Sequence, residues 1–167
     1  MRTSLLLPLA LVVALGACSG DSAPTTFSDP IAAMDAADSA KAAGDNVAAK
    51  AGYEYALENG EASLQADAMI GVFMVNIADG DEAAATASFA RLSSDFAASL
   101  DENAILNLLD ATVRTAKMVD LGDTILGYSI TALPEMKDKL ARVADDIEMI
   151  RTQGPGVDMS EVGYAGD

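Results

Sequence analysis

The sequence predicts an all-α fold, and three observations support that prediction. Residues 30–151 are rich in Ala, Leu, Met, Ile and Val with acidic residues interspersed, and they contain few aromatic residues and few prolines. This composition favours helices over strands. Pairs of glycine and aspartate recur along the same region, and each pair can end one helix and cap the next. The spacing of these pairs also repeats, which is typical of stacked helical hairpins.

Capping residues divide this region into its helices. The first helix begins where Asp29 can act as the N-cap and Pro30 occupies the first helical position. Later helices begin after Asp101 and with Pro134 in the first turn. Gly-Asp pairs separate further helices at residues 44–45, 80–81 and 122–123. The predicted helices are 30–43, 46–58, 62–79, 82–97, 102–120, 123–132 and 134–151.

A pattern of small and aromatic residues accompanies the first two Gly-Asp pairs. Gly44, Asp45, Ala48, Ala49 and Tyr53 recur 36 residues later as Gly80, Asp81, Ala84, Ala85 and Phe89. The small residue allows two helices to approach closely, and the aromatic residue one turn later fills the gap above it. With these residues the segment 30–97 resembles the tetratricopeptide-repeat family, whose units run helix, Gly-Asp turn, helix. The resemblance implies antiparallel helical hairpins stacked as a short superhelix with a concave groove.

The resemblance weakens beyond residue 97. Gly122, Asp123 and Gly127 keep the turn and the small position, but Thr131 stands where an aromatic residue is expected, and the interval is 42 residues. A compact Ala-rich helical bundle, whose hairpins share Gly-Asp caps by convergence, therefore stays open as the alternative architecture.

The predicted helix 62–79 has almost no polar face, so we expect it to be buried nearly all round. The family resemblance puts three of its residues on the floor of the groove and four residues of other helices beside them. The implied partner-binding residues are Ile70, Met74 and Ile77, flanked by Met34, Asp38, Thr112 and Ala116. Methionines adapt to varied apolar partners. The alternative interpretation is that these side chains only fill the core.

Residues 1–17 have the three parts of a secretory signal peptide. Arg2 supplies the positive start, residues 5–15 form an apolar run, and Gly16-Ala17 are the small residues before a cleavage site. The apolar run is too short to cross a membrane, which takes about 20 apolar residues. The segment is therefore predicted to be a signal peptide and not a transmembrane helix.

The end of this segment, Leu15-Gly16-Ala17-Cys18, resembles the lipobox of bacterial lipoproteins. The resemblance implies that Cys18 becomes the first residue and carries fatty acyl chains such as palmitate, which anchor the protein in a membrane. With Ser19 and not aspartate after the cysteine, the family's sorting rule favours the outer membrane, facing the periplasm. The alternative is an ordinary signal peptide cleaved nearby, with Cys18 incidental.

The domain organisation follows from these segments. We expect a signal peptide at 1–17, a flexible lipidated tether at 18–29, a helical domain at 30–151 and a flexible acidic tail at 152–167. The tether and the tail are rich in turn-forming and polar residues and lack an apolar period.

Composition excludes several function classes. The net charge of −16 disfavours binding to nucleic acid. The chain has no histidine and a single cysteine, so the common hydrolase arrangements and the commonest metal ligand are missing. The acidic group at residues 79–82 fits helix capping better than a calcium loop. We therefore expect no enzymatic activity, no catalytic residue, no metal and no cofactor.

Two further polar groups are predicted to be surface features. Residues 145, 146 and 148 are acidic and should form a solvated face of the last helix. Asn103, Asn107, Asp110, Arg114 and Lys117 form a polar stripe in which Asp110 and Arg114 can pair.

The functional expectation is a membrane-anchored lipoprotein that acts as a scaffold or assembly factor in the cell envelope and binds an envelope protein or peptide. A carrier of a lipid or other small apolar ligand, with a cavity lined by helix 62–79, is the alternative.

Overall fold

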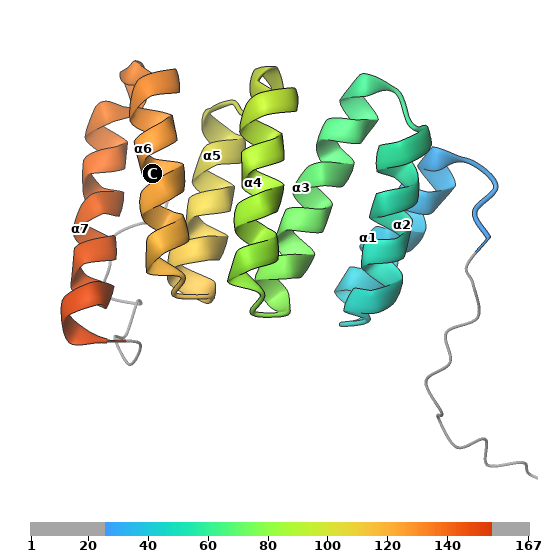
Figure 1. Cartoon of the computed structure of the whole chain (residues 1–167), viewed down its shortest axis with the longest axis horizontal. Helices are drawn as coiled ribbons and strands as arrows, with labels where there is room; N and C mark the ends of the chain where they lie inside the picture. The colour runs from blue at the N-terminus through green and yellow to red at the C-terminus, as the bar shows by residue number, and fades with distance from the viewer. Residues whose placement is uncertain (1–25, 155–167) are drawn as a thin grey trace, which may run out of the picture.

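The computed structural model describes residues 26–154, and the α-helical prediction is confirmed for this part of the chain, which contains no strand. Figure 1 shows the helices side by side in an open stack, with α1 and α7 at opposite ends. The helices are α1 (Pro30–Ala42), α2 (Asn46–Asn59), α3 (Ala62–Ala78), α4 (Glu82–Asp95), α5 (Glu102–Leu109), α6 (Val119–Ala132) and α7 (Lys137–Gln153). The predicted signal peptide, Cys18 and nearly all of the acidic tail lie outside the described residues.

The predicted helix boundaries agree with the structure to within three residues for the first four helices and the last one, and side-chain caps mark several of these boundaries. At the N-termini of α1, α2, α4 and α5, an aspartate accepts a hydrogen bond from the backbone N–H of the third helical residue. Gly44 and Gly80 have φ values of 77° and 72°, and the next N–H returns to a carbonyl of the preceding helix. This is the Schellman arrangement, which joins two helices with a short turn.

The first three helices pack closely because small residues lie between them. A Cβ at Gly52 of α2 would come within 2.7 Å of the carbonyl oxygen of Ala33 in α1. Ala37 and Ala49 have no exposed surface. Tyr53, which the repeat pattern assigned to the gap between helices, is buried between α1 and α3.

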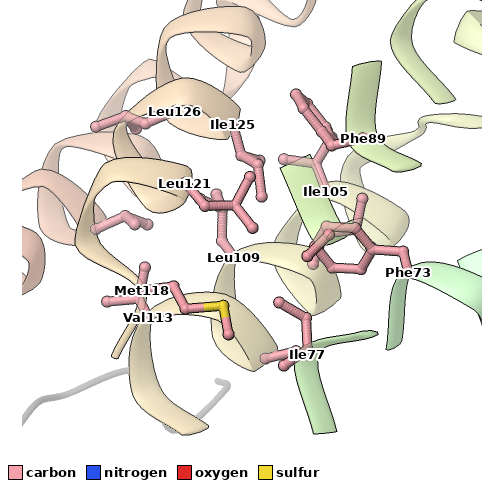
Figure 2. Packing of buried hydrophobic residues seen from close by; sticks show 14 of the residues in the cluster. Phe73, Ile77, Phe89, Ile105, Leu109, Val113, Met118, Leu121, Ile125 and Leu126 are labelled. Carbon is pink, nitrogen blue, oxygen red and sulfur yellow. The ribbon is translucent and has the colours of Figure 1, made fainter. Parts of the chain in front are cut away.

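The larger part of the core joins α3 to α7. Figure 2 shows Phe73 and Ile77 of α3 and Phe89 of α4 facing residues of the later helices, among them Ile105, Leu109, Val113, Met118, Leu121, Ile125 and Leu126. The opposite side of α3 presents Val72 and Val75 to the cluster around Tyr53. The prediction that α3 is buried nearly all round is therefore confirmed, with Leu64, Ile70 and Met74 the half-buried exceptions among its large apolar residues.

The predicted turn at Gly122-Asp123 is wrong. The helical segment that begins at Glu102 ends in a π-helical turn at Asp110–Thr115, and the chain reverses at Lys117, whose φ is 56°. Helix α6 then begins at Val119, so Gly122 lies inside its first turns. A Cβ at Gly122 would come within 2.8 Å of Val113, which shows that this glycine permits close helix packing and does not cap a helix.

Candidate functional site

An open hollow of about 320 Å³ lies between α1 and α3, the first helices of the first two hairpins. Its lining combines apolar, acidic and basic side chains with one buried tyrosine. The lining residues are Met34, Asp38 and Lys41 of α1, Tyr53 of α2, and Asp67, Ile70, Gly71 and Met74 of α3.

Helical spacing places these side chains on facing stripes. On α1 the lining positions are 34, 38 and 41, and on α3 they are 67, 70, 71 and 74. Residues three and four positions apart share one face of a helix, so each helix contributes one continuous edge to the hollow. The apolar members are half-buried, whereas the charged members are exposed.

Tyr53 forms the floor and is held from both sides. Its hydroxyl donates a hydrogen bond of 2.6 Å to Oδ1 of Asp38. Its ring lies against Gly71, where a Cβ would come within 2.6 Å of the ring carbons. Burial, together with the hydrogen bond and the negative charge of Asp38, raises the pKa of the Tyr53 phenol. The hydroxyl therefore stays protonated and continues to donate to Asp38 across the physiological range.

The electrostatic character of the hollow is acidic. Asp38 and Asp67 face a single lysine, Lys41, and the whole chain carries a net charge of −16. Within residues 26–154, neither Asp67 nor Lys41 forms an ion pair. Asp38 uses Oδ1 for Tyr53, which leaves Oδ2 able to accept from a bound group.

The structure brings together four of the seven residues that the sequence singled out for partner binding: Met34, Asp38, Ile70 and Met74 line this hollow. It does not bring Ile77, Thr112 or Ala116 to the hollow. Ile77 and Thr112 are buried at 5% and 0% exposure, and Ala116 packs beside the main core. The π-helical turn of residues 110–115 and the unequal repeat interval displace the third unit, so spacing carried over from the first two units fails here.

Sequence reasoning missed Lys41, Tyr53, Asp67 and Gly71 as lining residues. Lys41 and Asp67 could have been found, because each lies three residues from a predicted lining residue on the same helix face. The sequence shows Gly71 as a glycine within an apolar helix, but it does not indicate the contact between this glycine and the ring of Tyr53.

Other polar groups in the described region are structural. Lys50 Nζ donates to Asn76 Oδ1 at 3.2 Å, and Asn76 Nδ2 donates to Ser88 Oγ at 3.0 Å, which links α2, α3 and α4. The predicted Asp110–Arg114 pair is present at 3.2 Å. Within residues 26–154, no three or more His, Cys, Asp or Glu side chains gather into a group that could hold a metal ion.

Asp146 corrects the prediction of a solvated acidic face on α7. This residue is 3% exposed, and its Oδ2 has no hydrogen-bond partner within the described chain. Burial raises the pKa of the carboxyl, an effect that Arg114 opposes and Asp145 reinforces. Asp146 lies three residues after Val143 and four before Ile150 on the buried face of α7, whereas the other two acids, Asp145 and Glu148, are exposed.

Comparisons with known proteins show no relative: no family model matches the chain, and neither a curated protein nor a solved structure matches it. Among residues 26–154, no helix combines the length and apolar character that crossing a membrane requires. The tetratricopeptide resemblance and the lipobox therefore stay predictions from the residues quoted for them.

Proposed function

We propose that this protein is a lipid-anchored scaffold of the bacterial cell envelope and that it binds a segment of another protein in the hollow between α1 and α3. The observation that carries the proposal is the set of three half-buried apolar side chains, Met34, Ile70 and Met74, gathered in one open hollow and bordered by carboxylates. Apolar patches with a polar border are typical of interaction sites.

The construction of the hollow also favours binding. Its edges come from helices, and its floor is a buried tyrosine held by a hydrogen bond, so little ordering is needed when a partner binds. The two methionines can adjust their conformations to the shape of a bound side chain. A rigid frame with adaptable contact residues suits recognition of a protein segment.

The proposed anchor complements this site. A lipid on Cys18 would attach the chain to the membrane through residues 18–29, which can extend at most about 40 Å. The tether leads directly into α1, which forms one edge of the hollow. The proposed binding site would therefore stay close to the membrane surface, where envelope proteins are available.

A carrier of a lipid or small apolar ligand has less support. Most of the large apolar residues of α3 pack into the core, and only Ile70 and Met74 line the hollow. A hollow with three charged side chains around it suits a peptide better than a hydrocarbon chain.

Site-specific photo-cross-linking tests the proposed function. A benzoylphenylalanine at Ile70 should cross-link one discrete envelope protein in membranes, and Met74→Glu in the same chain should abolish that product. The same cross-linker at Thr86, which is exposed on α4 away from the hollow, is the control. Extracted lipid in place of a protein product, or equal products from both positions, would refute the proposal.

A further inference from the structure

We infer that the segment bound in the hollow is extended and presents a lysine or arginine side chain next to an apolar one. This inference rests on the proposed function and specifies the chemistry of the partner. It follows from three features of the hollow, which are its charge, the order of its lining residues and its size.

The charge of the hollow favours a cationic side chain. Asp67 forms no ion pair within residues 26–154, and Oδ2 of Asp38 is not used by Tyr53. Two carboxylates outnumber Lys41, and the net charge of −16 adds a long-range attraction for basic groups. An anionic side chain would be repelled by the two carboxylates and by the net negative charge of the chain, so charge complementarity disfavours an anionic partner.

The order of residues along the helices separates the charged and apolar parts. Asp67 precedes Ile70 by about one turn on α3, and Asp38 follows Met34 by about one turn on α1. Since α1 and α3 are alternate members of an antiparallel stack, they run in the same direction (Figure 1). Each edge of the hollow therefore places a carboxylate about one turn from an apolar side chain on the same helix.

The size of the hollow determines how much of a partner it can hold. A volume of about 320 Å³ is at the lower end of the range for ligand pockets, which is enough for one or two side chains. In an extended chain, side chains two residues apart point to the same side and lie about 7 Å apart. An apolar residue and a basic residue two positions apart in the bound segment would therefore reach the apolar side chains and a carboxylate of the hollow together.

Methyl NMR with short peptides tests this inference. The purified full chain, labelled with ¹³C at the methionine methyl groups, is titrated with three acetylated, amidated serine hexapeptides in which position 2 is leucine and position 4 is lysine, glutamine or glutamate. The leucine-lysine peptide should shift the methyl signals of Met34 and Met74. Met69 and Met136 are each 1% exposed and lie in the core, so their signals should change little. The glutamine peptide should bind at least threefold more weakly, and the glutamate peptide should not bind measurably.

Variants at two positions distinguish binding in the hollow from nonspecific attraction of a basic peptide to an acidic protein. Asp67→Asn should lower the affinity for the leucine-lysine peptide about threefold, and Asp67→Lys should lower it further. Glu54→Gln is the matched control, because Glu54 is exposed on α2 and does not line the hollow. If Glu54→Gln weakens binding as much as Asp67→Asn, the attraction is nonspecific and the inference is overturned.

The remaining outcomes distinguish this inference from the proposed function. Equal binding of all three peptides would overturn the preference for a cation while the hollow would still be an apolar peptide site. If no peptide moves Met34 or Met74, the inference fails, and the cross-linking result at Ile70 decides the proposed function separately.

Discussion

Gly71 offers a direct test of how the floor of the hollow is built. Replacing it with alanine adds one methyl group, and that Cβ would lie 2.6 Å from two ring carbons of Tyr53. The ring cannot move away easily, because Tyr53 is 1% exposed and its hydroxyl is bonded to Asp38. Overpacking of this kind costs about 1–3 kcal/mol.

The intrinsic helix preference of alanine acts in the opposite direction. Alanine is favoured over glycine inside a helix by about 1 kcal/mol. For Gly71→Ala we therefore expect a net loss of up to about 2 kcal/mol in the free energy of unfolding. Gly127 is the matched control: it is an exposed glycine within α6, and a Cβ there would meet nothing within 4 Å. Gly127→Ala should stabilise the protein by about 1 kcal/mol.

Urea denaturation followed by far-ultraviolet circular dichroism measures both variants in one assay. The two substitutions should change the unfolding free energy with opposite sign. If Gly71→Ala is as stable as Gly127→Ala, then Tyr53 is not held against α3 and the described floor of the hollow is wrong. A second substitution that removes the aromatic ring, Tyr53→Leu, should abolish most of the destabilisation that Gly71→Ala causes.

Three further predictions concern charge, partner capture and the anchor. Asp146→Asn should raise the free energy of unfolding by about 1 kcal/mol at pH 7, because a buried, poorly paired carboxylate is removed. Folding raises the pKa of Asp146, so the charged carboxylate destabilises the folded protein increasingly as the pH rises from the usual aspartate range to the raised pKa, and by a constant amount above it. Below the usual aspartate range the carboxyl is protonated in both states. Urea titrations should therefore show the wild type and Asp146→Asn becoming equally stable at that low pH. Met74→Glu should abolish cross-linking from Ile70 and cost only about 1 kcal/mol of stability, whereas unfolding of the variant would show that Met74 is a core residue. Cys18→Ser should release the protein from membranes into the soluble fraction, and a salt-resistant membrane pool of that variant would contradict the lipid anchor.

Helix boundaries could be predicted from the sequence wherever local chemistry decides them. Asp29 and Asp45 cap the helices that follow them through bonds to N–H groups three residues ahead, and Gly44 adopts the φ that a reversal needs. These interactions involve neighbours in the chain, so the residue types alone indicate them. The same reasoning failed at Gly122, because its role depends on Val113, which is close to it only after folding.

The part of the candidate site that lies on α1 and α3 could be predicted, because the first two helix pairs repeat the same sequence spacing. Met34 and Ile70 occupy equivalent positions in α1 and α3, and both line the hollow. Thr112 was expected beside them from the same pattern, but the π-helical turn places it in the interior. The burial of Asp146, in contrast, could have been predicted, because Asp146 stands three residues after Val143 and four before Ile150, on the apolar side of α7.

The hollow itself has a physical cause in the composition of α1. This helix buries only two residues, Ala33 and Ala37, whereas α3 buries nine. Alanine side chains bring α1 close to α2 but are too short to fill the space toward α3, so Met34 stays half-buried at that edge. Small buried area also means that α1 contributes little apolar stabilisation of its own. A segment bound between α1 and α3 would bury Met34 and Met74 further, and it would therefore stabilise α1 in the stack as it binds.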